Sequence, residues 1–522
     1  MFVCCVCDSN SIDVNTSSGS VRGQTLHVLN RKIHQFLNIP YAEPPLGPLR
    51  FAPPLPLNAP KQDIIDGTKL GNSCIQRMII GVNISEDCLV LNIWTANVDN
   101  SDDSPSLTVL KPVMFYIYGG GLSLDSIFYD HYNASVLATN DVVVVSVNYR
   151  VGPLGFLYGA DRTAPGNAGF YDQLLALKWV RENIHAFGGD KDQMTIFGQS
   201  AGSWSVSAHI LSPLSKGLFK RAIMQSGSLM YNRERPVLNT VEALQKAKQL
   251  AKRLNCDQYD YKWLDCLRAI QDPNLFIKVP ENGNPYILTH SVFGTEFLPI
   301  LPQKSLELGL YNSDIELIAG VTANEGTSLG FGLVPEMRAE LTEPLFRKAV
   351  HDLRNDYHNI NVDKVCDHYL KGVHKTNSSQ LKAAFRLLLG DLAITCPTYH
   401  FAKRLAANGH RVYFYQLSFQ CKLFDSHMGC IPGHVCHGAD LNLCFGHPLK
   451  QQTLFTETEY DFSIDVMKMW TNFAKTGKPH DIWPQLWDKS VIRVKDLNPN
   501  DLSLILDNPF ESTCDGIWSQ YF

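Results

Sequence analysis

The sequence lacks a long hydrophobic run, a strong excess of either charge, and any internal repeat or low-complexity tract. A helix that crosses a bilayer needs roughly 20 mostly apolar residues, and no run in this chain reaches that length. The formal net charge of the 522 residues is −5, and no basic face or stripe indicates a nucleic-acid partner. These absences argue against a transmembrane span, against nucleic-acid binding and against a repeat architecture.

The N-terminus also lacks a recognisable secretory signal. Residues 1–7 (MFVCCVC) are apolar, but they are too short for a signal peptide and contain no basic residue. Cys4, Cys5 and Cys7 are candidate palmitoylation sites, although a truncated or mis-called start explains the segment more simply. We expect residues 1–15 to be disordered or to belong to a mis-called N-terminus.

Cysteine, by contrast, is plentiful. The 14 cysteines are an even number, and several lie close enough together to close short loops as pairs. Disulfides form and persist in oxidising compartments, so such pairing favours secretion. Four Asn-x-Ser/Thr sequons, little more than chance would give, add some weight; they begin at Asn15, Asn83, Asn133 and Asn377. We therefore expect a secreted glycoprotein with disulfide bonds.

The composition is that of an ordinary globular protein, with 45% hydrophobic and 19% charged residues. Short apolar runs, typical of strands buried on both faces of a parallel sheet, recur along the chain. They cover residues 113–118, 142–147, 194–197, 222–225, 315–319 and 412–417. Helical patterns lie between the runs, for example over 172–187 and 461–475. This alternation predicts an α/β fold with a large, mostly parallel central sheet and helices on both faces, and we expect residues 1–522 to form one domain.

One pentapeptide, Gly198-Gln199-Ser200-Ala201-Gly202, has the clearest chemical meaning. It follows the expected strand at 194–197 and precedes a plausible helix over 203–211. A tight turn between strand and helix holds a serine in a strained conformation and exposes its hydroxyl. A side chain at either flanking glycine would collide with the neighbouring strand or helix. A glycine- and serine-rich turn without chemistry is the alternative, but the context favours Ser200 as a nucleophile.

Attack by a serine creates an oxyanion on the substrate, and the oxyanion requires hydrogen-bond donors. Gly119, Gly120 and Gly121 directly follow the apolar run that ends at Tyr118. Glycine lets the backbone approach a substrate closely and turn its N–H groups towards it. With the N–H of Ala201, the N–H groups of Gly120 and Gly121 are candidates for a three-donor oxyanion hole.

Motifs spread along nearly the whole chain carry a resemblance to a known family. They are FLNIPYAEPP at 36–45, LRF at 49–51, SEDCLVLNI at 85–93, NYRVG at 148–152, GNAG at 166–169, FGGD at 187–190 and GQSAG at 198–202. The sequence resembles the type-B carboxylesterase/cholinesterase family. This resemblance implies an α/β-hydrolase fold and a serine esterase that works through an acyl-enzyme. Neither a cofactor nor a metal is implied, and the partner is a small-molecule ester.

The resemblance also assigns the other two catalytic groups. Glu325, in GVTANEG at 320–326, matches the family's acid, and His437, in HVCHGAD at 434–440, matches its base. We expect His437 to take the proton of Ser200 and Glu325 to orient the imidazole. The order nucleophile, acid, histidine is the chain order of this fold. The residues alone do not single out the base among 17 histidines, because several others lie nearby, namely His427, His434 and His447.

Three disulfides and two buried ion pairs are further implications of the resemblance. The disulfides are Cys74–Cys88, Cys256–Cys266 and Cys396–Cys514, and the ion pairs are Arg50 with Glu86 and Arg150 with Asp172. The family pattern leaves five cysteines unexplained: Cys366, Cys421, Cys430, Cys436 and Cys444. An extra bridge such as Cys421–Cys430 is one option. A metal site of Cys430, His434, Cys436 and His437 is a competing option, but it would disable the base.

Three features that bind choline esters in the family are missing from this chain. Residues 75–87, between the first two paired cysteines, contain no aromatic residue, Ser328 stands where a second aromatic would lie, and neutral Gln199 replaces an acidic residue. Phe293 and Thr295 align with the acyl-pocket positions, and a threonine there leaves room for a longer or bulkier acyl group. We therefore expect a broad carboxylesterase that acts on apolar esters.

Three alternatives stay open. GQSAG together with Arg50-Phe51 and Asp172-Gln173 is similar to juvenile hormone esterases, although His434 stands where those enzymes have glycine. A cholinesterase-like enzyme is the second alternative. A non-catalytic adhesion or sequestration relative is the third, but such relatives have lost the nucleophile or the base, and this chain retains both.

Overall fold

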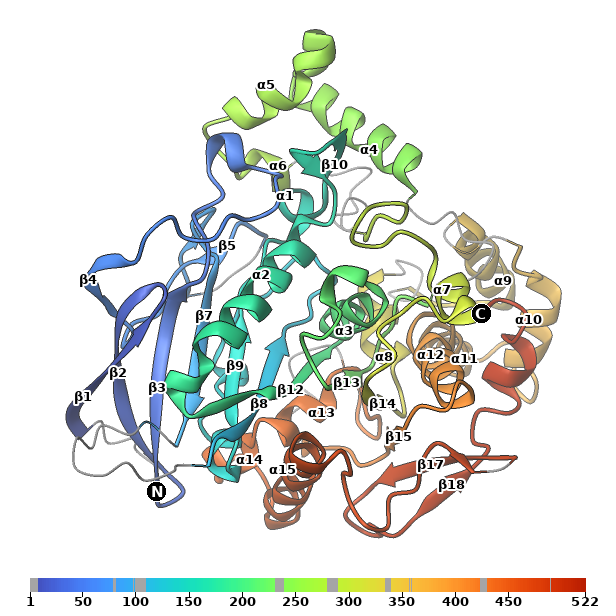
Figure 1. Cartoon of the computed structure of the whole chain (residues 1–522). Helices are drawn as coiled ribbons and strands as arrows, with labels where there is room; N and C mark the ends of the chain where they lie inside the picture. The colour runs from blue at the N-terminus through green and yellow to red at the C-terminus, as the bar shows by residue number, and fades with distance from the viewer. Residues whose placement is uncertain are drawn as a thin grey trace.

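A 14-stranded sheet forms the centre of the protein (Figure 1). The computed structural model describes residues 8–77, 81–96, 98, 109–230, 239–278, 290–333, 339–355, 357, 359–422, 430–488 and 490–522. The strands follow one another across the sheet in the order β1-β2-β3-β7-β9-β8-β12-β13-β14-β15-β17-β16, while β4 pairs with β2 and β18 pairs with β17.

The middle of the sheet is parallel. Its strands are β9 (Val143–Val147), β8 (Lys111–Ile117), β12 (Gly189–Gln199), β13 (Arg221–Gln225), β14 (Glu316–Thr322), β15 (Val412–Leu417) and β17 (Val491–Leu497). Most residues of these strands from β9 to β15 are buried, which is why the sequence shows continuous apolar runs rather than alternation. The predicted fold class is confirmed.

Antiparallel strands flank the parallel region. On one side lie β1 (Asp8–Thr16), β2 (Gly19–Val28), β3 (Arg31–Pro40) and β7 (Val90–Thr95), and on the other lie β16 (Trp487–Asp488) and β18 (Ile505–Asp507). Strand β4 (Lys61–Asp66) pairs in parallel with β2. Two short pairs lie outside the sheet, β5 (Ser73–Cys74) with β6 (Ile84–Ser85) and β10 (Tyr158–Asp161) with β11 (Ala164–Pro165).

The N-terminal segment differs from the expectation of disorder over residues 1–15. From Asp8 onward it forms β1, which pairs antiparallel with β2. Ile12 and Val14 are both 5% exposed, and polar residues alternate with them, so this edge strand buries one face. Residues 1–7, and with them Cys4, Cys5 and Cys7, lie outside the described residues.

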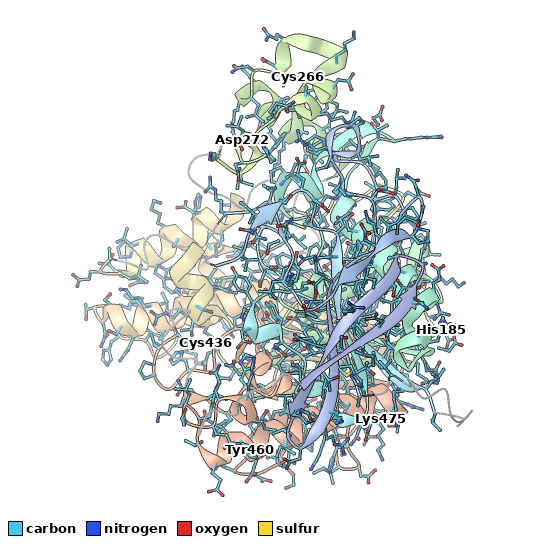
Figure 2. The ribbon with its side chains drawn as sticks, turned by 90° about the vertical axis from the view of Figure 1, so that its left-hand side faces the viewer. His185, Cys266, Asp272, Cys436, Tyr460 and Lys475 are labelled. Atoms are coloured by element: carbon cyan, nitrogen blue, oxygen red, sulfur yellow. A yellow bond between two sulfur atoms is a disulfide. The ribbon has the colours of Figure 1, made fainter. Side chains whose placement is uncertain are left out.

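Helices lie on both sides of the sheet, as the view from its β1–β3 edge shows (Figure 2). α3 (Ala201–Leu211) packs on β8, β12 and β13, α12 (Cys396–Ala407) packs on β14 and β15, and α15 (Glu457–Thr476) packs on β8 and β12. α2 (Ala168–Asn183) continues as a 3₁₀ turn to Phe187 and ends at Gly188, and α15 ends at Gly477. Both glycines have a positive φ, the usual conformation after a helix end.

The remaining helices connect and extend this core. They are α1 (Gly152–Phe156), α4 (Thr240–Arg253), α5 (Trp263–Ala269), α6 (Leu275–Lys278), α7 (Pro302–Leu308), α8 (Gly326–Leu333), α9 (Glu343–Asp352), α10 (Val362–Tyr369), α11 (Ser378–Gly390), α13 (Ala439–Cys444) and α14 (His447–Lys450). Helices α4 and α5 project from one end of the molecule (Figure 1). Apolar side chains of both helices belong to a second, smaller hydrophobic cluster, which also includes Phe51, Leu154 and Phe276. Among the described residues, none of the helices is both long and apolar enough to span a membrane.

Four disulfides join described cysteines. Three are the pairings that the family resemblance implies, Cys74–Cys88, Cys256–Cys266 and Cys396–Cys514, and the fourth is Cys430–Cys436. The bridge Cys421–Cys430 is therefore wrong, because Cys430 is already paired within its own short loop. That disulfide also takes two of the four side chains that the alternative metal site would need.

Both implied ion pairs are present and buried. Arg50 Nη2 lies 2.7 Å from Glu86 Oε2, and Arg150 Nη2 lies 2.6 Å from Asp172 Oδ1. Nε of each arginine donates to the same carboxylate, so both pairs have the bidentate geometry that strengthens an arginine–carboxylate contact. Arg50 also donates to three backbone carbonyls of residues 267–270, which ties α5 to the segment before Phe51.

Candidate active site

The register of four parallel strands brings the candidate residues to one edge of the sheet. Gly198 of β12 lies opposite Ile117 of β8, and Gln199 lies opposite Gln225 of β13. Gln225 in turn lies opposite Gly320 of β14. The segments that follow these strands therefore begin side by side at the carboxyl edge of the sheet, where α/β folds bind their ligands.

Ser200 occupies the sharp turn between β12 and α3. Its φ of 59° and ψ of −123° are a strained conformation for a residue with a side chain. Its N–H donates to the Gln225 carbonyl at 2.8 Å, which fixes the turn against the next strand. An added Cβ would lie 2.6 Å from the Ile117 carbonyl oxygen at Gly198 and 2.0 Å from it at Gly202, so both glycines are sterically required. Ser200 is partly exposed, and its hydroxyl has no hydrogen-bond partner within the described part of the chain.

Glu325 and His437 are in direct contact. Oε2 of the buried Glu325 lies 2.5 Å from Nδ1 of His437. The other carboxylate oxygen, Oε1, accepts from the Ser226 hydroxyl at 2.6 Å and from the Thr322 N–H at 2.7 Å. A carboxylate that accepts three hydrogen bonds is well compensated for burial. Because it can only accept, it assigns the imidazole proton to Nδ1 and leaves the lone pair on Nε2.

The loop before His437 is joined to the loop that carries Glu325. The Asn324 N–H donates to the Val435 carbonyl at 2.9 Å, and the Val435 N–H donates to Asn324 Oδ1 at 2.8 Å. The Cys430–Cys436 disulfide closes the same loop one residue before His437. Acid and base are therefore held together by backbone contacts as well as by their own hydrogen bond.

Gln199 contacts His437 on its other ring nitrogen. Nε2 of Gln199 lies 3.2 Å from Nε2 of His437, and the Gln199 side chain is buried. The amide is enclosed between two glycines, since a Cβ at Gly119 or at Gly438 would lie 3.4 Å from it. The sequence singled out Gln199 because a neutral residue replaces an acidic one at this position, but it did not predict the contact with His437.

The candidate oxyanion donors lie beside Ser200. Gly120 and Gly121 have φ values of 78° and 64°, and a Cβ at Gly120 would lie 2.2 Å from the Leu124 carbonyl oxygen. A Cβ at Gly119 would lie 3.1 Å from that of Ser200, so this loop passes directly beside the nucleophile. Ala201 is the first residue of α3, and N–H groups in a first helical turn have no partner within the helix.

The candidate pocket residues lie in two places. Phe293 and Thr295 are buried in the segment before α7, where the Thr295 hydroxyl donates to the Val292 carbonyl and accepts from Asn167 Nδ2 at 3.0 Å. This hydroxyl is thus hydrogen-bonded within the protein. Ser328 lies in the first turn of α8 and is partly exposed.

A second layer of polar residues beneath the triad was missed by the sequence analysis. Ser226, which follows β13 directly and donates to Glu325, has a strained φ of 59°. Asp440 is buried and accepts from the Tyr415 hydroxyl at 2.6 Å and from Gln225 Nε2 at 2.9 Å. Burial raises the pKa of the Asp440 carboxyl. Polar residues at or just after the ends of adjacent apolar strands, such as Gln225 and Ser226, were the available signal.

Comparison with known proteins agrees with this geometry. The model of the carboxylesterase family matches residues 10–504. An acetylcholinesterase of Leptinotarsa decemlineata is 35% identical over 517 residues, which cover 90% of this chain and 80% of the relative. A cholinesterase of Mus musculus is 34% identical over 90% of this chain and 81% of the relative, and an acetylcholinesterase of Bungarus fasciatus is 34% identical over 91% and 80%. The predicted ester hydrolase is confirmed: the chain belongs to the carboxylesterase family and is a carboxylic ester hydrolase.

Proposed function

We propose that the protein hydrolyses small apolar carboxylic esters through an acyl-enzyme on Ser200, with His437 as the proton carrier and Glu325 as its partner. The observation that carries the proposal is the buried 2.5 Å contact between Glu325 and His437 at the edge of the sheet where Ser200 sits in its strained turn. A nucleophile, a base and a third group that orients the base are the parts that acyl transfer needs.

The reaction follows from the positions of these groups. His437 Nε2 takes the hydroxyl proton while Ser200 Oγ attacks the ester carbonyl carbon, and the N–H groups of Gly120, Gly121 and Ala201 hold the oxyanion. His437 then gives the proton to the leaving alcohol, and the acyl-enzyme remains. Water, deprotonated by His437, attacks the acyl carbon, and Ser200 recovers its proton as the acid leaves. Glu325 keeps Nδ1 protonated throughout and stabilises the imidazolium that forms twice.

The preference for apolar esters rests on the charge and the ring content of the site. A quaternary ammonium group is bound by aromatic faces and by negative charge. Here Gln199, next to the nucleophile, is a neutral amide whose N–H group faces His437, and residues 75–87 contain no aromatic side chain. Thr295 presents a methyl group where a ring would narrow the acyl pocket.

A choline ester is the second candidate substrate, because the relatives compared above are named as cholinesterases. Hydrolysis of p-nitrophenyl butyrate and of acetylthiocholine by the purified protein separates the two proposals. We expect a higher kcat/KM for p-nitrophenyl butyrate. A marked preference for acetylthiocholine would overturn the choice of apolar esters and leave the catalytic assignment intact.

The catalytic assignment is tested with paired variants. We expect Ser200→Ala and His437→Gln to lose the activity and the covalent labelling by an organophosphate. His434→Gln is the matched control, because His434 lies in the same loop but its Nδ1 is engaged with the Thr327 hydroxyl at 2.8 Å. Wild-type rates for Ser200→Ala, or equal losses for His434→Gln and His437→Gln, would refute the assignment.

We further propose that the protein is secreted and glycosylated. Four disulfides among the described residues suit an oxidising compartment. The sequons at Asn83 and Asn377 lie at exposed positions. Expression in a eukaryotic host, followed by endoglycosidase treatment of the medium, is the test. Protein that stays inside the cells and shows no shift in mass would contradict this proposal.

A further inference from the structure

The lone pair of the base is already occupied in the structure. Since Glu325 fixes the proton of neutral His437 on Nδ1, Nε2 can only accept a hydrogen bond. The group that faces Nε2, at 3.2 Å, is the amide nitrogen of Gln199, which can only donate. Ser200 needs the same lone pair, and its hydroxyl makes no hydrogen bond within the described part of the chain.

Gln199 has little freedom to move out of this position. Gln199 is the last residue of β12, where its backbone pairs with Gln225, and it is 5% exposed. Gly119 and Gly438 lie next to the amide, and a Cβ at either position would lie 3.4 Å from it, in van der Waals contact. The contact with His437 is therefore a built feature of the site.

The terminal torsion of a glutamine is broad and roughly two-fold, so the amide can still turn over in place. In that second orientation Oε1 would face Nε2 and would accept from the protonated imidazole. An uncharged amide can therefore hydrogen-bond to Nε2 of either the neutral or the protonated His437. A carboxylate at the same place could hydrogen-bond only to the protonated imidazole, and its negative charge would favour that state.

We propose that Gln199 is a further positioning residue of the reaction, which competes with Ser200 for Nε2 of neutral His437 and, unlike a carboxylate at the same place, adds no charge beside the base. The inference rests on the proposed roles of Ser200 and His437. In the resting enzyme the imidazole is held by Gln199 and Glu325 together. It engages Ser200 only when the Gln199 hydrogen bond is given up, so Gln199 lowers the rate moderately, and it preserves activity at a lower pH than a carboxylate at the same place would.

Among the described residues, the ionisable groups that face His437 from the surrounding elements are Glu325, before α8, and Asp440, in α13. Neither is changed by substitution of Gln199. Glu325 accepts three hydrogen bonds, and Asp440 is tied to Tyr415 and Gln225. A shift in the pH profile of a Gln199 variant therefore reports on the residue at position 199 itself.

The test compares Gln199→Glu and Gln199→Met, with Gln193→Met as the matched control. Gln193 lies on the same strand, and its Oε1 accepts from Arg221, outside the site. Rates with p-nitrophenyl butyrate are measured from pH 5 to 9, and active sites are counted by organophosphate titration. For Gln199→Glu we expect the acid limb of kcat/KM to move up by about one pH unit.

For Gln199→Met we expect the plateau of kcat/KM to rise about 2- to 10-fold, the range that the net contribution of one hydrogen bond gives. We expect Gln193→Met to match the wild type in both respects. An acid limb that stays in place in Gln199→Glu, or a plateau that does not rise in Gln199→Met, overturns the inference. Failure of the proposed function would appear separately, as activity retained in Ser200→Ala and His437→Gln.

Discussion

Replacing Glu325 by glutamine tests the tautomer argument directly, because the structure determines how the new amide must lie. Oε1 of Glu325 accepts from the Thr322 N–H and from the Ser226 hydroxyl, at 2.7 and 2.6 Å. In Glu325→Gln the carbonyl oxygen must stay with these donors, since an NH₂ group there would face the Thr322 N–H. The amide nitrogen is then turned towards His437 Nδ1.

A donor opposite Nδ1 selects the other neutral tautomer, with the proton on Nε2. That nitrogen no longer has a lone pair for the Ser200 proton, and the charge that stabilised the imidazolium is gone as well. The equivalent change in a serine protease triad lowers kcat by about 10⁴ with the geometry intact. We expect a loss of about 10³- to 10⁴-fold in kcat for p-nitrophenyl butyrate, with a small change in KM.

The assay measures steady-state rates from pH 6 to 10, together with thermal unfolding of each variant. Glu316→Gln is a suitable control, because Glu316 lies on β14, pairs with Arg221 and Arg411, and is remote from the base. A Glu325→Gln enzyme that folds normally and keeps kcat within tenfold of the wild type would refute the assigned tautomer and the role of Glu325.

Three further predictions concern stability. Replacing both Cys430 and Cys436 by serine should lower the free energy of unfolding, measured by denaturant titration, by about 2 kcal/mol, because the pair closes a short loop. An unchanged value would mean that the loop is held by its contacts with Asn324 alone. Arg150→Met should cost about 3–5 kcal/mol by the same measurement, since Asp172 would stay buried without its partner, and the double variant Arg150→Met/Asp172→Leu should recover part of that loss. Burial raises the pKa of Asp391 to about 7, so the folded protein holds this proton more tightly than the unfolded chain and loses stability as the pH rises from about 4 to 7. Asp391→Asn should therefore be more stable than the wild type by about 2–4 kcal/mol at pH 8 and equal to it below pH 4, and a constant difference across this range would contradict the assignment.

Several elements were predictable because their signals are local. The parallel strands β8, β9, β12, β13, β14 and β15 each contain a continuous apolar run. The turn at Ser200 is marked in the sequence by two flanking glycines that are sterically required. Strand β1 was not expected, because among its residues 11–16 only Ile12 and Val14 are core side chains, and an edge strand buries one face alone. The acid and the base came from the family motifs, since no local pattern distinguishes Glu325 or His437 from other residues of their type.

The contacts that the sequence could not give are those set by register and loop packing. The pairing of Cys430 with Cys436 depends on how the loop before α13 folds back on Asn324, and four cysteines between 421 and 444 allow several other bridges. Ser226 reaches Glu325 because β13 and β14 are in parallel register. The Gln199 contact requires the end of β12 and the turn at Gly438 to meet, which neither segment reveals alone.

These contacts also bear on the choice of substrate. Two carboxyl groups lie near the imidazole. Glu325 accepts hydrogen bonds from three donors, Ser226, Thr322 and His437. Asp440 accepts from Tyr415 and Gln225, and burial raises its pKa. Position 199, beside the nucleophile, contributes a neutral amide that is itself occupied by His437. The carboxylates of the site are thus hydrogen-bonded to protein groups, and little negative charge faces a bound ester. A cationic alcohol group would gain little electrostatic binding free energy in such a site, whereas the binding of a neutral, apolar ester does not depend on that charge. This difference supports the proposal of apolar esters over choline esters.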